Sequence, residues 1–389
     1  MPANSTARGI GLGHRPELAA DLIAGPSVVD FVEVVAEACM ANPSARREAH
    51  ACKALWPVIT HGVKLSLGSA DGIDDAHAQR LGRLARELDA PLVSEHASFT
   101  RGGSREIGHL TRLPYTRAAI GVLARNVARA RRFLPDVPLL LENVAATLEW
   151  REDEMDEPEF HCELVRATGC PMLLDLGNLY ANAVNRGRDP LRELLRFPLA
   201  HVAMLHVAGG AWEHGFYLDT HADPIPDPVY ELARIVTAEI GAVPILLERD
   251  AGFGRFADLL AELERLRAMT TDVPAYAPPA RRDDGRVLVD SPELVGLQRE
   301  LAEALIAAQA PGPAIEARFG TEALARTRTI LARKRIDDAM PHLPRLSAHL
   351  SALRDGIREL AASALLDHPL TPSRASSPDA WRILQRALL

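Results

Sequence analysis

The sequence has little cysteine, no long hydrophobic run and no excess of positive charge. Four of its 389 residues are cysteine and none forms a CxxC pair, so we expect free thiols rather than disulfides. Apolar stretches stay below the ~18 residues of a transmembrane helix, and residues 1–17 lack the basic stretch and apolar segment of a secretory signal. We therefore expect a cytoplasmic protein that does not span a membrane.

Several functional classes are disfavoured by what is missing. The net charge of −8 argues against nucleic-acid binding as the main task, because neutralising phosphates requires positive charge. No GxGxxG follows the first predicted strand, and the sequence has no P-loop, GxSxG or HExxH motif. A dinucleotide site and nucleophilic serine or cysteine catalysis therefore have no support.

The first 270 residues alternate short apolar runs with amphipathic helical patterns, such as 75–89, 115–134 and 228–240. Each run is short and almost continuously apolar, as buried parallel strands are. The runs cover 9–12, 30–35, 57–63, 91–96, 138–143, 171–176, 202–209 and 244–250. Eight strands alternating with helices predict a (β/α)8 TIM barrel in the α/β class, with a doubly wound open sheet as the alternative.

The remaining sequence predicts a helical extension. Residues 271–290 combine prolines with mixed charge, which is typical of a linker. Ser291-Pro292 is a favourable start for a helix, and the following leucines form one apolar stripe at 294, 297, 301 and 305. Further helices are predicted over 321–340, 344–366 and 377–381. We therefore expect a barrel over 1–270, a linker over 271–290 and a helical C-terminal module over 291–389.

Polar residues fall at the ends of the predicted strands, and Asp219 and His221 lie in the loop that is predicted after the seventh strand. The carboxyl ends of barrel strands meet at one rim, where carboxylates and imidazoles would converge. Burying several acids together is costly unless a cation neutralises them, and a mixture of imidazole and carboxylate suits Fe, Mn, Zn or Co. The candidate metal ligands, enough for two or three ions, are His61, His96, Glu142, Asp175, His206, Asp219, His221 and Glu248.

Other polar residues lie beside these candidates. Glu95, Asn143 and Asn178 could bind metal or instead orient the imidazoles. Glu33 and Glu37 lie at and just after the end of the second predicted strand. Asn182 and Asn185 follow the sixth strand, where a substrate contact and a simple turn are equally compatible with the sequence. Cys39 follows the second strand and could face the site.

With these motifs the sequence resembles the multinuclear non-haem iron-dependent oxidative enzymes, whose best-known member acts in methanobactin biosynthesis. The resemblance covers roughly residues 8–270. Single motifs are weak, but their order and spacing together are specific. They are GIGLGHRPE (9–17), DFVEVVAEACM (30–40), HGVKLSLGS (61–69), SEHASF (94–99), LLENVAATL (140–148), LLDLGNLYANAVNRGRDP (173–190), LHVAGG (205–210), DTHADPIPDPVY (219–230) and LLERDAGF (246–253).

The resemblance implies a xylose isomerase-like TIM barrel and O2-dependent oxidation of a ribosomally made precursor peptide, at cysteine or a C-terminal residue. It implies two or three iron ions in mixed Fe(II)/Fe(III) states, held by the eight candidate ligands, with Glu142, Asp175 and His206 central to catalysis. Family members often work with a separate partner protein, which the C-terminal module could replace by recognising the peptide; the module could instead only stabilise the barrel.

Three other functions stay open on the same barrel. A sugar isomerase or epimerase would need a similar rim of His, Glu and Asp with one or two Mn, Mg or Co ions. A nuclease similar to endonuclease IV would also fit the rim, although the net charge of −8 argues against it. A non-enzymatic scaffold would bind metal and peptide without changing the peptide.

Overall fold

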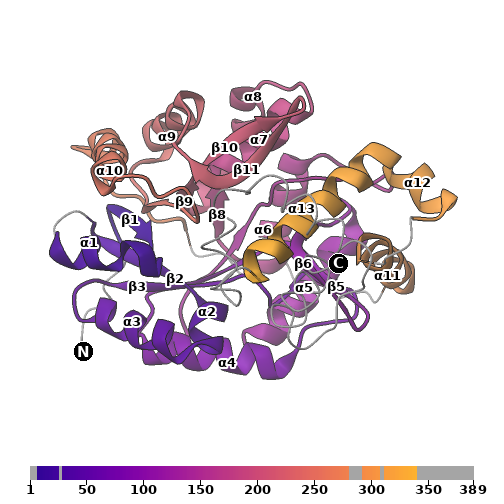
Figure 1. Cartoon of the computed structure of the whole chain (residues 1–389), viewed down its shortest axis with the longest axis horizontal. Coiled ribbons are helices and arrows are strands. Elements are labelled where there is room, and N and C mark those ends of the chain that lie inside the picture. Colours follow the sequence, from indigo (N-terminus) through magenta and orange to yellow (C-terminus); the bar gives the residue numbers. More distant parts are fainter. Residues whose placement is uncertain (1–6, 26–28, 280–290, 307–310, 340–389) are drawn as a thin grey trace, which may run out of the picture.

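The computed structural model describes residues 7–25, 29–279, 291–306 and 311–339. Among them, eight parallel strands close into a barrel in the order β1-β12-β9-β8-β7-β4-β3-β2, with helices around it (Figure 1). Because β1 pairs with both β2 and β12, the sheet has no free edge, and the predicted barrel is confirmed over the open sheet. The strands are β1 (Ile10–Gly13), β2 (Phe31–Val35), β3 (Val58–Gly62), β4 (Val93–His96), β7 (Leu139–Glu142), β8 (Met172–Asp175), β9 (Val202–Val207) and β12 (Ile245–Leu247).

The inside of the barrel is filled by a small apolar cluster that supports the rim. It is separate from the larger cluster between the strands and the outer helices. Successive strand residues alternate between the two faces, so the residue two positions further along also points inward. The inner cluster includes Phe31, Ile59, Leu140, Leu173, Met204 and Leu246. A step of two residues from each of them reaches Glu33, His61, Glu142, Asp175, His206 and Glu248, which form the polar layer above.

Two hairpins, which the sequence did not predict, follow rim strands. The first pairs β5 (Ser98–Gly102) with β6 (Arg105–Arg112) directly after β4. The second pairs β10 (Gly209–Glu213) with β11 (Phe216–Asp223) directly after β9. His214 and Gly215, both with positive φ, make the tight turn of the second hairpin. Asp219 and His221 therefore lie on a strand, not in the loop that we expected.

The outer helices begin and end where the local chemistry favours it. Thr116 caps one helix by accepting a hydrogen bond from the Ala119 N–H, and Gly169 ends another in the left-handed conformation. The three predicted helical patterns are confirmed within a few residues as α4, α5 and α9. The helices are α1 (Ala19–Ala24), α2 (Ala36–Ala41), α3 (Pro43–Lys53), α4 (Asp75–Glu87), α5 (Arg117–Ala130), α6 (Glu157–Thr168), α7 (Leu176–Asn185), α8 (Pro190–Leu194), α9 (Asp227–Ile240) and α10 (Phe256–Thr270), with short 3-10 turns at Pro16–Leu18 and Leu199–His201.

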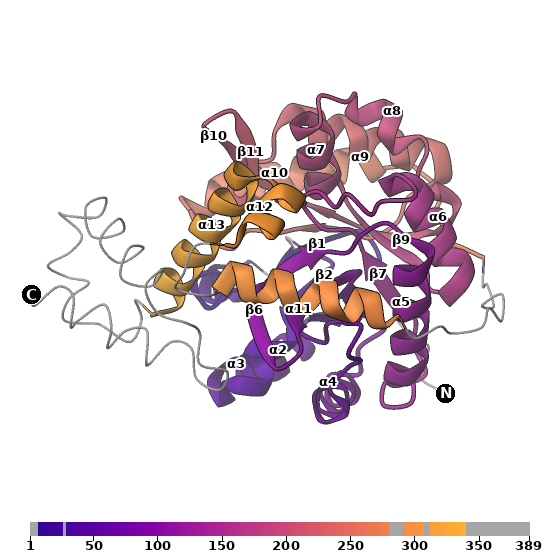
Figure 2. The same ribbon diagram turned by 90° about the vertical axis from the view of Figure 1, so that its right-hand side faces the viewer.

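Within the described residues, three helices follow residue 290 and pack on the barrel side that carries the two hairpins (Figure 2). They are α11 (Pro292–Ile306), α12 (Pro313–Phe319) and α13 (Thr321–Ala339). The side chain of Gln298 is wholly buried, donating to the Gly68 carbonyl and accepting from the Ala70 N–H at 2.8 Å each. Leu294, Leu301 and Leu305 of the predicted stripe belong to the main hydrophobic cluster. The predicted helices over 344–366 and 377–381, and most of the predicted linker, lie outside the described residues.

Candidate metal centre

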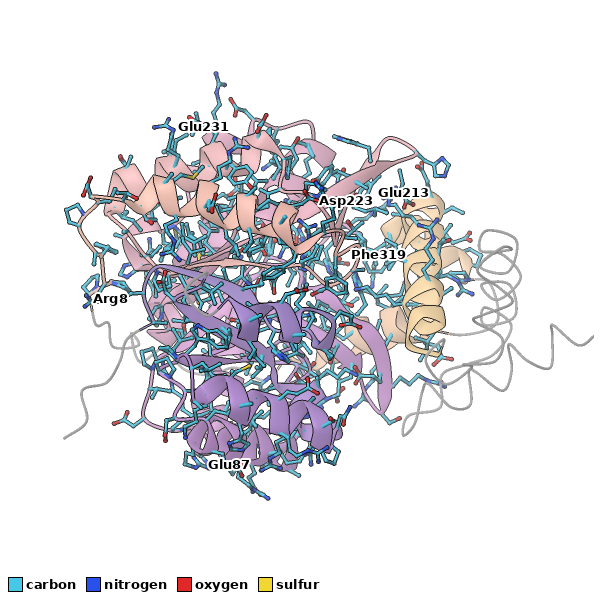
Figure 3. All side chains as sticks on the ribbon, turned by 60° about the vertical axis from the view of Figure 1, so that its left-hand side comes forward. Arg8, Glu87, Glu213, Asp223, Glu231 and Phe319 are labelled. Atoms are coloured by element: carbon cyan, nitrogen blue, oxygen red, sulfur yellow. The ribbon has the colours of Figure 1, made fainter. Side chains whose placement is uncertain are left out.

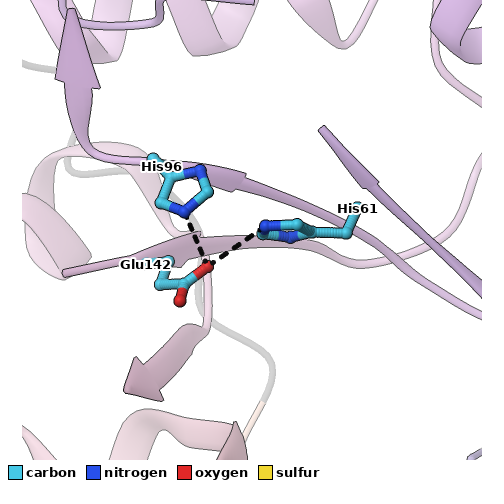
Figure 4. A group of neighbouring side chains, drawn as sticks. All are labelled: His61, His96 and Glu142. Carbon is cyan, nitrogen blue, oxygen red and sulfur yellow. Dashed lines mark ion pairs between the residues drawn. The ribbon is translucent and has the colours of Figure 1, made fainter. Parts of the chain in front are cut away.

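Glu142 lies at the middle of the polar layer and faces three imidazoles. Its Oε2 atom is 3.6 Å from Nε2 of His61 and 3.3 Å from Nε2 of His96 (Figure 4). Its other oxygen, Oε1, is 3.3 Å from Nδ1 of His206. These side chains come from the ends of β3, β4, β7 and β9, so the closed barrel sets their spacing.

Three overlapping groups of side chains in the described residues could each hold a metal ion, with their ligand atoms within 4.8 Å of one another. Glu142 belongs to the first two groups and Glu248 to the last two. The groups are His61, His96 and Glu142; then Glu142, Asp175, His206 and Glu248; then Glu33, His61 and Glu248. Since the two oxygens of Glu142 face different groups, this carboxylate could bridge two ions.

Four buried polar atoms of the site, three in this layer and one on Asp219 of β11, form no hydrogen bond among the described residues. They are Glu142 Oε2, Asp175 Oδ2, His206 Nδ1 and Asp219 Oδ1. Glu142 Oε2 and His206 Nδ1 still face ion-pair partners at 3.3 Å, whereas Asp175 belongs to no ion pair among the described residues. Leaving one such atom unpaired usually costs ~1–3 kcal/mol, which indicates that another group belongs there. All four sit on imidazoles and carboxylates, which are the donors that transition metals bind. The side chains therefore fit a metal centre.

The protein contacts the second nitrogen of each central imidazole. Nδ1 of His61 lies 2.8 Å from Ser94 Oγ, and Nε2 of His206 lies 3.3 Å from Glu33 Oε2. His96 has its Nδ1 between the Gly62 carbonyl at 3.3 Å and Glu95 Oε1 at 3.4 Å. Such contacts fix the ring orientation and tautomer of metal-binding histidines. In each ring, the other nitrogen faces Glu142.

Asn143 and Asn178 contact Asp175 and not an imidazole. The Asn143 side chain donates to the Asp175 carbonyl and accepts from the Asp175 N–H, at 2.9 Å in each case. Asn178 donates from its side chain to the Asn143 carbonyl, and its backbone N–H donates to Asp175 Oδ1 at 2.6 Å. The two asparagines therefore fix the position of Asp175, whereas Glu95 contacts His96.

Asp219 and His221 form the outer part of the site and belong to none of the three groups. Nε2 of His221 is 2.6 Å from Asp219 Oδ2, while Nδ1 is 3.4 Å from Glu248 Oε2 and 3.3 Å from Asp250 Oδ2. Asp250 in turn forms an ion pair with Arg15. A Cβ atom at Gly177 would lie 3.2 Å from Asp175 Oδ1 and 3.3 Å from Asp219 Oδ1, so this glycine leaves room for both acids.

Without a cation the charges in this layer are poorly balanced. Burial, with the nearby Asp219 and Glu142 carboxylates, raises the pKa of Asp175 well above its usual value. Burial alone would lower the pKa of His96, but Glu142 and Glu95 raise it to about 9. The pKa of His206 is likewise raised, against burial, by Glu33, Glu248 and Glu142. Metal ions could replace the protons that these groups would otherwise retain.

Glu33 is not among the ligands predicted from the sequence. Its side chain is 3% exposed and belongs to the third group, with His61 and Glu248. It also lies 3.3 Å from Nε2 of His206. The signal was available, because Glu33 follows the inward Phe31 by two residues, as Glu142 follows Leu140. Glu37 lies elsewhere, accepting from the Val63 and Lys64 N–H groups at 3.0 Å.

Asn182, Asn185 and Cys39 have structural contacts. Asn182 donates to the Val144 carbonyl, and Asn185 pairs with the backbone of Tyr217. Cys39 is in the hydrophobic core with its Sγ 3.8 Å from the Ala45 carbonyl, so it does not face the site.

The fold and the site define a (β/α)8-barrel protein with a buried centre of imidazoles and carboxylates that could bind metal ions. Residues 9–271 match the family described as "RiPP precursor modification enzyme MbnB/TglH/ChrH", where a RiPP is a ribosomally synthesised and post-translationally modified peptide. The chain belongs to this family, which confirms the resemblance seen in the sequence. Members of this family are described as enzymes that modify precursor peptides. Helices α11–α13 lie outside the matched residues.

Several proteins of known sequence or structure are similar to this chain. A UPF0276 protein of Streptomyces avermitilis is 40% identical over 268 residues, which cover 67% of this chain and 54% of that protein. A UPF0276 protein of Caulobacter vibrioides is 38% identical over 264 residues, covering 67% and 93%. Endonuclease IV from Thermus thermophilus is 19% identical with a TM-score of 0.44, covering 67% and 98%. The chain thus spans about half of the Streptomyces relative and nearly all of the Caulobacter one.

None of the described helices is both long and apolar enough to cross a membrane.

Proposed function

We propose that this protein is an iron-dependent, O2-using enzyme that oxidises a ribosomally made precursor peptide at cysteine or a C-terminal residue. The observation that carries the proposal is the buried set of imidazoles and carboxylates, four of whose polar atoms form no hydrogen bond within the described residues. Membership of a family that modifies precursor peptides supplies the substrate class. Imidazole and carboxylate together, without thiolate, are a ligand set typical of non-haem iron.

The proposed ligands are the eight residues named from the sequence: His61, His96, Glu142, Asp175, His206, Asp219, His221 and Glu248. Glu142 would bridge two ions, because Oε2 faces His61 and His96 while Oε1 faces His206. His61 has only Nε2 available for a metal ion, because its Nδ1 contacts Ser94. It could therefore bind an ion in the first group or in the third group, but not in both. The geometry therefore favours two ions in the barrel layer and leaves a third for the outer part.

The chain's own residues would hold the reacting groups in a fixed, dry arrangement. Glu142, Asp175 and His206 are each at most 1% exposed, so solvent reaches this layer poorly. Glu33 would accept a hydrogen bond from Nε2 of His206 and leave Nδ1 as the ligand atom. Asn143 and Asn178 would keep Asp175 in place. Iron bound here would supply the redox chemistry, in which O2 is reduced and the peptide is oxidised.

The substrate partner would be the precursor peptide, with no nucleic acid or membrane involved. We further propose that the barrel over 1–270 carries the chemistry and that residues 291–389 replace the separate partner protein of other members or stabilise the barrel. The described helices α11–α13 pack on the barrel side that carries the rim hairpins, as a built-in partner would need to do.

The test is metal analysis of anaerobically purified protein, with an absorption spectrum before and after air and mass analysis of a candidate precursor peptide encoded nearby. The proposal expects two or three irons per chain, a spectral change in air, O2 consumption and a mass change in the peptide. Bound Mn or Co with sugar turnover and no O2 uptake would instead indicate the isomerase. Iron and peptide binding with no mass change would indicate a scaffold.

A further inference from the structure

Helix α13 contacts three separate segments that rise from the barrel rim. On the hairpin after β4, Lys334 Nζ lies 3.2 Å from Nδ1 of His109. Beyond β7, the Thr147 and Thr327 hydroxyl oxygens lie 3.0 Å apart, within hydrogen-bonding distance. Two further contacts reach the β10–β11 hairpin, which carries Asp219 and His221. The helix therefore spans the rim and connects segments that the barrel strands do not connect.

The contacts with the β10–β11 hairpin involve two arginines. The Arg326 guanidinium carbon lies 3.9 Å from the centre of the Phe216 ring, and Arg333 Nη1 is 2.6 Å from Glu213 Oε2. Figure 3 shows Glu213 on the hairpin next to the C-terminal helices. One contact reaches each strand of the hairpin, because Glu213 is on β10 and Phe216 is on β11.

Apolar packing fixes α13 in this position. Leu324, Thr327 and Leu331 are 5% exposed or less and follow one another at helical spacing, so one face of the helix is buried. Arg328 donates to the Ala304 carbonyl of α11 at 2.6 Å. Since α11 is itself anchored by the buried Gln298, α13 is connected to the barrel body through α11.

The β10–β11 hairpin needs such support. Among the described residues it pairs with no other strand, and an isolated two-stranded hairpin is marginally stable in water. His221 also has a φ of +51°, a conformation that a non-glycine residue keeps only when its surroundings enforce it. From α7, the Asn185 side chain donates to the Tyr217 carbonyl at 2.9 Å and accepts from its N–H at 2.7 Å. The hairpin is thus supported by α7 and by α13.

We propose that α13 positions the β10–β11 hairpin, so that the C-terminal helices complete the metal centre by holding Asp219 and His221 in place. Arg326 and Arg333 are the positioning residues, and neither touches a proposed ligand. The metal part of this inference rests on the proposed function. The positioning of the hairpin does not, because it concerns contacts within the chain.

The test compares two double variants of the full-length protein. Arg326→Met with Arg333→Met removes both contacts to the hairpin and leaves the buried face of α13 intact. Arg234→Met with Arg255→Met is the matched control, because it removes the same charge from arginines whose ion pairs lie within α9 and near the start of α10. The readouts are hydrogen exchange over 209–223, release of iron to a chelator, and kcat and KM for the peptide.

The free energy of a partly buried cation–π contact and an exposed ion pair together corresponds to a change of about tenfold in the exchange rate of the hairpin amides. In the test variant we expect hairpin amides to exchange about tenfold faster and part of the iron to be released about tenfold faster, while barrel-strand amides and the control stay unchanged. Combining Arg333→Glu with Glu213→Arg should restore slower exchange than Arg333→Glu alone. Unchanged exchange, or faster exchange with unchanged iron release, would overturn the inference. If the wild type binds no iron, the proposed function fails, and the exchange still decides whether α13 positions the hairpin.

A second pair of variants examines the rim contact of the same helix. Thr327→Val removes the hydroxyl that reaches Thr147, whereas Thr329→Val removes an exposed hydroxyl that, like that of Thr327, bonds the carbonyl four residues earlier. We expect faster amide exchange in the hairpin for Thr327→Val and not for Thr329→Val. Equal exchange in the two variants would contradict it.

Discussion

The two parts of the candidate centre are held in different ways. The inner part, around Glu142, stands on strands of a closed barrel whose register fixes every side chain. The outer part, Asp219 and His221, stands on a two-stranded hairpin supported by α7 and α13. The inner part therefore depends on the barrel alone, whereas the outer part depends on residues far away in the sequence. This difference predicts that variants of the inner part and variants of the outer part lose different amounts of metal.

The largest effect should follow from Glu142→Ala or His206→Ala. Both residues belong to the second group, which also contains Asp175 and Glu248. Glu142 belongs in addition to the first group, with His61 and His96. We expect most of the iron to be lost and turnover to fall by more than about 100-fold, beyond what removal of a supporting residue costs. The fold should survive, because rim residues lie above the apolar core. Metal analysis measures the iron content and circular dichroism checks the fold. The control is His50→Ala, at an exposed histidine. Full iron content and normal turnover in both variants would refute the assignment.

His221→Ala should remove only part of the metal. The group of His61, His96 and Glu142 does not include His221, so its ion should remain. We expect the iron content to fall by one ion or less per chain, with turnover reduced at least about tenfold. Quantitative metal analysis beside Glu142→Ala checks the contrast. Equal loss of all iron in the two variants would show that the inner and outer parts are not separable.

Gly177→Ala tests the boundary between the two parts. Alanine favours a helix by ~1 kcal/mol over glycine, so the thermal stability of the metal-free protein should not fall. The added Cβ would nevertheless press on Asp175 and Asp219, and iron affinity should drop about tenfold. Gly296→Ala on α11 is the matched control, since its Cβ would meet no atom within 4 Å. If both variants bind iron as tightly as the wild type, the two acids do not share a metal-binding region.

The inner part should also respond to pH. The pKa of His96 is about 9 in the folded, metal-free chain against about 6.5 when unfolded, so folding favours the protonated ring. The stabilisation is complete below pH 6.5 and is lost as the pH rises through 9. Thermal unfolding of metal-free protein should therefore occur at lower temperature at pH 9 than at pH 6.5, and His96→Gln should flatten this trend. Iron affinity should rise over the same range, because protons must leave the imidazoles.

The smallest effect should come from the thiols outside both parts. Cys52 and Cys170 are buried in the main core, and the Cys162 thiol faces the Arg196 carbonyl. Replacing all three with serine should leave turnover within about twofold, at a stability cost of about 1 kcal/mol for each buried site. A peptide-oxidation assay checks this. A loss of more than tenfold would mean that one of them takes part in the reaction.

Most of the inner part could be predicted from the sequence. Strand residues alternate between two faces, so each inward apolar residue, such as Leu140 or Leu173, places the residue two positions later at the same side of the barrel. That local rule brings Glu142 and Asp175 to the rim, and it would also have identified Glu33. The rule does not say which atoms meet, because that depends on the register between neighbouring strands.

A periodicity of a few residues is enough to predict the eight strands, the leucine stripe of α11 and the polar residues at the ends of the strands. Three features emerge only from the folded chain: Glu142 faces three imidazoles, Asp219 and His221 stand on a hairpin, and Arg326 and Arg333 reach that hairpin from α13. The contacts of Glu142 join residues 46 to 81 positions apart, and those of Arg326 and Arg333 join residues 110 and 120 positions apart, so local propensity carries no information about them. They are fixed by closure of the barrel and by the packing of α11 and α13 against it.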